Sequence, residues 1–142
     1  MNEKAVVIIP IYKTQIDENE QRSLKQCFKI LGAHPIVFIK SEKLDVSSYY
    51  PHLDGHDFRI ESFDNDFFSD IRGYNRLMLS QELYGRFLNY KYMLIYQLDA
   101  FVFSDQLLYW CDKEYDYIGG PWVEPYKLEM RIKAYLHYKL NI

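Results

Sequence analysis

One carboxylate set in an apolar stretch is the side chain best placed to do chemistry in this chain. Asp99 lies within residues 92–103, which read Tyr-Met-Leu-Ile-Tyr-Gln-Leu-Asp-Ala-Phe-Val-Phe. Such a run predicts a central parallel strand buried on both faces, where an unpaired carboxylate is costly. We therefore expect Asp99 where that strand ends and a cleft begins, the usual ligand position in open α/β sheets. The alternative is structural: Asp99 braces the next turn near Ser104 and Asp105.

The elements that must position Asp99 begin with a short buried strand. Residues 5–12 predict this strand, and Pro10 limits it because proline cannot donate to a strand ladder. A capping-box spacing then predicts a helix over residues 17–31, and residues 35–39 predict a second strand. The order strand, helix, strand predicts an α/β fold with a mostly parallel, doubly wound, Rossmann-like sheet and flanking helices.

A third strand and a long helix follow in the sequence. Residues 59–63 predict the strand, and residues 71–89 predict a helix that is apolar on more than one side. Arg76 falls near the start of this helix, where a cation opposes the helix dipole. Either a bound anion explains Arg76, or an ion pair with Asp70 or Glu82 does.

The C-terminal part carries a turn and an amphipathic segment. Residues 115–122 predict a brief strand ending in a Gly-Gly-Pro-Trp turn, in which Trp122 either roofs a pocket or anchors the core. Residues 125–142 alternate basic and apolar side chains and predict a C-terminal amphipathic basic helix. This helix is expected to pack on its own domain or on a partner; peripheral contact with an anionic membrane is the alternative.

Composition narrows the classes of function. The length of 142 residues predicts a single domain, 1–142, and the formal net charge of −3 does not indicate binding to nucleic acid, which normally requires a basic face. Cys27 and Cys111 are expected to be reduced core thiols. The sequence shows no signal peptide and no run of the roughly 18 apolar residues that a membrane span requires, so we expect a cytoplasmic protein without a transmembrane segment.

Two other segments contain residue types that bind metals. The loop over residues 41–57 has four such side chains: His52, Asp54, His56 and Asp57. Without a fixed frame they are expected to be solvated. Residues 64–66 begin like a calcium loop, but Ser69 occupies the position where that loop requires glycine.

Five segments stand out when they are taken together and in order. They are residues 7–12 (VIIPIY), 23–27 (SLKQC), 73–79 (GYNRLML), 96–103 (YQLDAFVF) and 117–122 (YIGGPW). Spread over residues 5–122, they resemble the N-terminal part of domain of unknown function 5672. That family looks like the GT-A-type glycosyltransferases, which use nucleotide sugars.

The resemblance implies roles for particular residues. In GT-A enzymes the first strand borders the nucleoside and a helix arginine faces the diphosphate, so Pro10, Tyr12 and Arg76 would bind the nucleotide sugar. Asp99 would complete this site, with Trp122 as its candidate roof.

The resemblance also implies a metal ion. GT-A enzymes hold Mn²⁺ or Mg²⁺ against the diphosphate with an Asp-x-Asp-like motif, and Asp99 is the candidate ligand here. Gln97 and Phe101 stand where a second carboxylate would be. Metal binding is therefore expected to be weak, shared with Asp105, or absent.

The function implied is a glycosyltransferase-like domain that binds a nucleotide-diphosphate sugar for synthesis of cell-surface polysaccharide or glycan. Members of the family continue into a Gly-Asn-Gly-Gly-type motif that this chain lacks, so a truncated domain without the acceptor half is expected. No catalytic residue is assigned: Asp116 and Glu124 are acidic, but their spacing selects neither. The alternative is an inactive relative that acts as a binding or interaction module. A nucleotidyltransferase is disfavoured because residues 13–16 contain no glycine for a phosphate loop.

Overall fold

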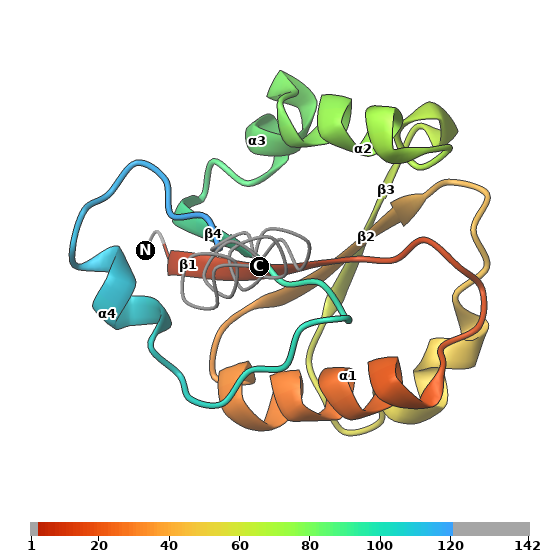
Figure 1. The fold of residues 1–142 in the computed structure, drawn as a ribbon, viewed down its shortest axis with the longest axis horizontal. Helices are drawn as coiled ribbons and strands as arrows, with labels where there is room; N and C mark the ends of the chain where they lie inside the picture. The colour runs from red at the N-terminus through yellow and green to blue at the C-terminus, as the bar shows by residue number, and fades with distance from the viewer. Residues whose placement is uncertain (1–2, 121–142) are drawn as a thin grey trace, which may run out of the picture.

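The structure, a computed structural model, describes residues 3–120. Four strands form an all-parallel sheet in the order β3-β2-β1-β4. They are β1 (Glu3–Pro10), β2 (Ile36–Ser41), β3 (Arg59–Phe63) and β4 (Tyr90–Ile95). Helices cover both faces of the sheet (Figure 1). The predicted α/β, Rossmann-like class is confirmed, and so are the first three strands.

Helix α1 (Glu18–Leu31) covers one face of the sheet. It begins as predicted, because Asp17 accepts hydrogen bonds from the backbone amides of Asn19 and Glu20 while the Glu20 carboxylate accepts one from the amide of Asp17. The apolar side of α1 is buried against strand residues such as Val7. The helix predicted over residues 17–31 is thereby confirmed.

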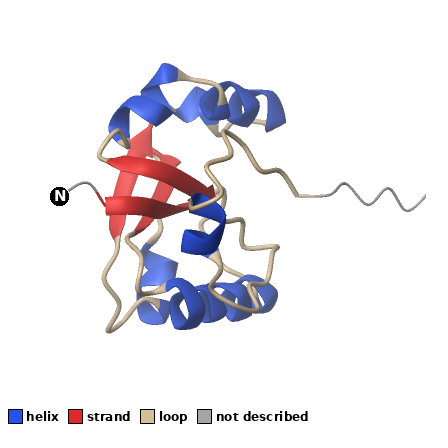
Figure 2. Ribbon diagram, turned by 90° about the vertical axis from the view of Figure 1, so that its left-hand side faces the viewer, coloured by secondary structure: helices blue, strands red, loops and turns tan. Residues whose placement is uncertain are grey.

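Two shorter helices, α2 (Ile71–Met78) and α3 (Gln81–Arg86), cover the opposite face. Figure 2 shows the sheet lying between the two helical layers. Successive β1 side chains point to opposite faces, so Val6 joins the core beneath α2 and α3, whereas Val7 joins the core beneath α1. β1 is therefore buried on both faces, and so is the first part of β2, whose Phe38 and Val37 lie in the two different cores.

The prediction of one long helix over residues 71–89 is wrong. Ser80 interrupts it, because its hydroxyl accepts a hydrogen bond from the Leu83 amide at 3.1 Å and so caps the start of α3. Arg76 consequently lies in the last turn of α2, where a cation suits the helix dipole instead of opposing it. The dipole argument for an anion beside Arg76 is lost.

The central strand predicted over residues 92–103 is also wrong in its extent and place. β4 ends at Ile95, and within the described residues it forms an edge of the sheet beside β1. The chain leaves the sheet because residues 97–100 form a turn, closed by a 3.0 Å hydrogen bond from the Ala100 amide to the Gln97 carbonyl. Apolar residue types continue past this turn, which explains the overlong prediction.

The remaining described segments are short. They comprise the 3₁₀ helices η1 (Ser47–His52) and η2 (Asn65–Phe67), and the helix α4 (Leu107–Cys111). The strand predicted within residues 115–122 is absent from its described part, 115–120. Cys27 and Cys111 are buried and unpaired, as predicted. None of the helices between residues 3 and 120 has the length and apolar character needed to cross a membrane.

Candidate functional site

Polar side chains meet where the strand order of the sheet reverses. β1 is flanked by β2, which follows it in the chain, and by β4, the last strand described. Such a switch point is where open α/β sheets bind ligands, just beyond the carboxyl ends of the strands. Ile8 pairs with Ile95 in the register of β1 and β4, so the residues that follow both strands emerge at the same edge. We call this edge the switch-point site.

Two tyrosines and a glutamine form the centre of the switch-point site. Tyr12 follows β1, Gln97 follows β4, and Tyr74 projects from α2. The rings of Tyr12 and Tyr74 meet edge to face with centroids 5.5 Å apart, and the Gln97 side-chain amide donates to the Tyr74 hydroxyl at 3.2 Å. Phe68, after η2, contacts Tyr12 with ring centroids 5.9 Å apart. Residues from four separate segments thus meet around Tyr12 and Tyr74.

Asp99 supplies the negative charge of this site. It lies in the turn after β4, is exposed, and has no hydrogen-bonding partner among residues 3–120. Burial raises the pKa of Tyr12 well above its ordinary value of 10.0, and Tyr74 and the charge of Asp99 raise it further. The pKa of Tyr74 is also raised, chiefly by burial, with a smaller contribution from Asp99. Both phenols therefore remain protonated donors at neutral pH, close to a free carboxylate.

The turn that carries Asp99 is fastened to α1. The Ser23 hydroxyl lies 2.9 Å from that of Tyr96, and both hydrogen-bond to the carbonyl of Ala100. One helical turn further on, the Gln26 side-chain amide donates to the Val102 carbonyl at 2.9 Å. Ser23 is only 2% exposed, so these bonds are shielded from water. The position of Asp99 therefore depends on α1 as well as on β4.

The other predicted site residues are placed differently. Pro10 is buried as the last residue of β1, so it shapes the end of the strand and does not face an open site. Arg76 is exposed; its guanidinium donates to the Asp66 carbonyl at 3.3 Å and lies 6.0 Å from the Phe67 ring. Within residues 3–120, no hydrogen bond, ion pair or ring contact joins it to Tyr12 or Asp99, so the structure does not bring it into the switch-point site. Trp122 lies outside the described residues.

The acidic residues considered as partners of Arg76 and Asp99 make other contacts in the structure. The Asp70 carboxylate caps α2 through the Gly73 amide at 2.7 Å, and Glu82 pairs with Arg86 at 2.8 Å, so the ion pair considered for Arg76 is not formed with either. Asp105 accepts from the Leu107 amide and pairs with His34, which precedes β2. Asp105 is therefore held near the opposite, amino edge of the sheet, and it is Asp105 rather than Asp99 that braces the following turn.

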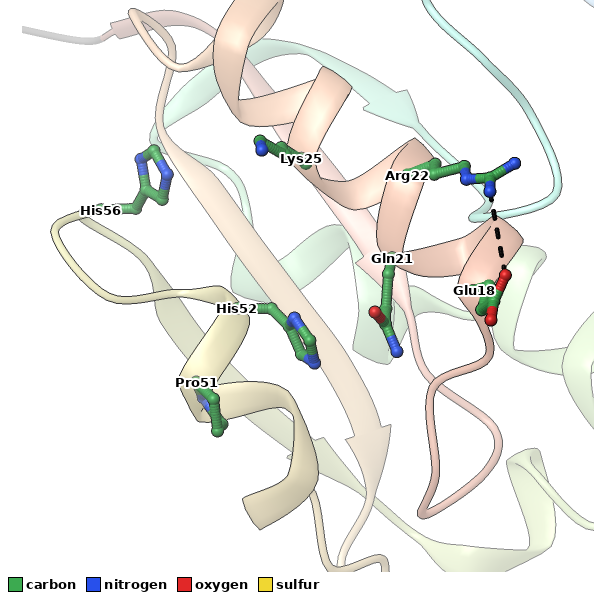
Figure 3. A pocket seen from close by; sticks show the side chains of 7 residues that line it. All are labelled: Glu18, Gln21, Arg22, Lys25, Pro51, His52 and His56. Atoms are coloured by element: carbon green, nitrogen blue, oxygen red, sulfur yellow. Dashed lines mark ion pairs between the residues drawn. The ribbon is translucent and has the colours of Figure 1, made fainter.

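A hollow of about 570 Å³ lies elsewhere, on the outer side of α1 (Figure 3). Its lining residues come from α1 and from the segment around η1: Glu18, Gln21, Arg22, Lys25, Pro51, His52 and His56. It is open to solvent, and Arg22 pairs with Glu18 at 3.8 Å across its rim. Two cations accompany the histidines, and no cluster of three His, Cys, Asp or Glu side chains able to hold a metal occurs between residues 3 and 120. The switch-point site remains the better candidate because the strands themselves converge there.

Sequence reasoning missed two members of the switch-point site. Tyr74 was interpreted only as an apolar residue of the predicted helix, and Gln97 only as the residue that replaces a second carboxylate. A usable signal existed for both: Gln97 follows the carboxyl end of β4, and helices that follow parallel strands begin at that same edge, as α2 does soon after β3. Tyr12 and Asp99 were predicted to share a site, and the structure brings them together.

The arrangement can bind a polar ligand through ring stacking and hydrogen bonds. Tyr12 is 45% exposed, so its ring offers a surface for stacking while its hydroxyl can donate. Asp99 can accept hydrogen bonds from hydroxyl groups or hold a hard cation through oxygen. With one free carboxylate, this site would bind a divalent cation weakly unless the ligand supplied further oxygen atoms.

Comparison with known protein families finds the same unknown-function family, over the C-terminal part of the chain. Residues 57–138 match the family described as "Protein of unknown function (DUF5672)", a span that runs from just before β3 beyond α4. No curated protein and no solved structure matches the chain. Because the matched span exceeds half of the sequence, the chain belongs to the DUF5672 family of proteins of unknown function.

Proposed function

We propose that the switch-point site binds a nucleoside-diphosphate sugar and that the chain is a glycosyltransferase-like domain acting in cell-surface polysaccharide or glycan synthesis. The observation that carries this proposal is the convergence of Tyr12, Tyr74, Gln97 and Asp99 where β1 and β4 end. This is the edge at which Rossmann-like sheets bind nucleotides. The resemblance of residues 7–12 and 96–103 to GT-A-type enzymes supports a nucleotide that carries a sugar as the ligand.

Each residue has a role in this proposal. Tyr12 would stack on or border the nucleoside, and Asp99 would accept from sugar or ribose hydroxyls or meet the diphosphate through a metal. Arg76 would have to leave the Asp66 carbonyl by a change of side-chain rotamer for its guanidinium to meet the phosphates. Pro10 would fix the end of β1, and Trp122 stays a candidate roof.

A divalent cation fits the donor set only with help from the ligand. Asp99 and the side-chain carbonyl of Gln97 are oxygen donors at this edge, and the remaining positions would be filled by diphosphate oxygens and water. When bound, Mn²⁺ or Mg²⁺ would neutralise charge on the departing nucleoside diphosphate. Its affinity in the absence of nucleotide should be low.

A binding or interaction module without catalysis is the second candidate. The single carboxylate of the switch-point site favours it, because GT-A-type metal binding uses two. Such a module would bind the same nucleotide but would neither hydrolyse nor transfer the sugar.

Thermal unfolding against a panel of nucleoside diphosphates and their sugars, with and without Mn²⁺, tests the proposal. A ligand present at about 100 times its Kd adds roughly 2.7 kcal/mol to the stability, which raises the Tm by on the order of 5 to 10 °C. Asp99→Ala should reduce this shift. The matched control is Asp57→Ala, which removes an exposed carboxylate ahead of β3 at the other edge of the sheet. A cooperative transition that no nucleotide shifts would refute the proposal.

A further inference from the structure

Large apolar side chains are exposed on and after α4. Six of them, which we call the α4 surface, are between 44% and 86% exposed: Leu108, Tyr109, Trp110, Tyr115, Tyr117 and Ile118. Soluble proteins seldom expose so many large apolar residues within one short stretch unless another surface covers them. This stretch is therefore a candidate docking surface.

The helix that bears this surface is anchored to the sheet. Cys111 is buried, and Leu107 packs against the core beneath α1. Asp112 pairs with Lys4 of β1, and Glu114 pairs with Lys91 of β4 at 3.1 Å. These contacts place α4 near the amino ends of β1 and β4, away from the switch-point site (Figure 1). The exposed aromatic rings of α4 thus belong to a helix whose position is fixed by contacts with the sheet.

Within the exposed set, two rings already contact each other. Tyr109 and Trp110 meet edge to face with centroids 5.3 Å apart, and the Lys113 ammonium lies 4.7 Å from the Tyr109 centroid. Such a group offers apolar area with a polar rim, the usual composition of a surface that another segment covers.

We infer that residues 121–142 of the same chain pack their apolar side chains on the α4 surface. This segment follows the surface directly in sequence, and its apolar residues recur at the spacing of one helical face: Leu128, Ile132, Tyr135, Leu136 and Leu140. The segment lies outside the described residues.

Charge and family membership point to the same occupant. Residues 121–142 carry four basic and two acidic side chains, whereas residues 3–120 carry 13 basic and 18 acidic ones. A positively charged segment is thus attracted to a negatively charged body. The family match spans residues 57–138, so most of this segment lies in the same matched region as β4 and α4.

The fluorescence of Trp110 provides the test. The chain has two tryptophans, so Trp122→Phe leaves Trp110 as the single reporter. In this full-length background, Ile132→Asp places a charge on the apolar side of the segment. Ala134→Asp is the matched control, because it adds the same charge two residues away and so on the opposite side of a helical pattern.

The inference predicts that Trp110 is shielded from acrylamide in the parent and in Ala134→Asp, and that Ile132→Asp raises the quenching constant and shifts the emission to longer wavelength. Equal quenching in all three proteins would overturn it. So would shielding that disappears on dilution together with a change from dimer to monomer by light scattering, because a second copy would then be the cover. Shielding that appears only when anionic vesicles are added would likewise contradict it in favour of a membrane.

Discussion

The hydroxyl oxygens of Ser23 and Tyr96 lie 2.9 Å apart although the two residues are 73 positions apart in the chain. Both hydroxyls also hydrogen-bond to the carbonyl of Ala100, one residue after Asp99. This buried contact joins α1 to the turn that follows β4. A serine inside a helix thus positions the carboxylate of the switch-point site.

Ser23→Ala should destabilise the protein by about 1–3 kcal/mol, because it leaves the buried Tyr96 hydroxyl and the Ala100 carbonyl with fewer partners. Urea denaturation measures this difference. Tyr96→Phe removes the other hydroxyl, and the double variant completes a cycle that should be clearly non-additive. Additive losses would show that the two hydroxyls act independently and would contradict the proposed coupling.

Gly73→Ala should also destabilise the fold. A Cβ atom at Gly73 would lie 2.2 Å from the carbonyl oxygen of Asp66, so α2 would have to move away from η2 at a cost of roughly 1–3 kcal/mol. Gly85→Ala in α3 is the matched control, since a Cβ there meets nothing within 4 Å. Alanine at that position should stabilise the helix by up to about 1 kcal/mol. Thermal unfolding of the two variants should therefore shift in opposite directions.

The N-cap of α1 should give the stability a pH dependence in acid. Hydrogen bonds from the backbone amide of Glu20 and the ammonium of Lys13 lower the pKa of Asp17 from 3.8 to about 2. A lowered folded-state pKa stabilises the fold above the unfolded value, and this stabilisation is lost as the pH falls from about 4 towards 2. Asp17→Asn keeps a capping oxygen but cannot titrate. The stability difference between native and Asp17→Asn proteins should shrink over that window, and a constant difference would refute the assignment.

The two cysteines should resist thiol reagents while the protein is folded. Burial raises the pKa of Cys27 to about 12 and also raises that of Cys111, so neither forms much thiolate at neutral pH. Labelling with Ellman's reagent should be slow in buffer and complete in urea. Rapid labelling of the native protein would show that one of these helices opens locally.

The parts of the fold that the sequence predicted well depend on local signals. The α1 helix follows from a capping box and a regular apolar face, and the first three strands follow from short apolar runs bounded by turn residues. β4 was overextended because Phe101 and Phe103 continue the apolar pattern after the chain has left the sheet. The strand ends at the turn over residues 97–100, which Ser23 holds from α1 through the Ala100 carbonyl, and no local sequence window contains this tertiary contact.

The candidate site was predictable only in part for the same reason. Tyr12 and Asp99 follow parallel strands, so a shared edge could be expected for them from fold class alone. Tyr74 reaches the site because of where α2 lies, and the position of α2 depends on the close approach of Gly73 to η2. Arg76 was misjudged because the break at Ser80 shortens its helix and changes the end of the dipole that it meets.

Calorimetric titration of the native chain and of Asp99→Ala with the nucleotide sugar that gives the largest thermal shift, in the presence of Mn²⁺, tests the central claim most directly. Since Asp99 is the free carboxylate of the switch-point site, its loss should weaken binding by at least about tenfold, or about 1.4 kcal/mol. Asp57→Ala should bind like the native chain. Equal affinity of the native and Asp99→Ala proteins, or the absence of binding by the native chain, would contradict the account.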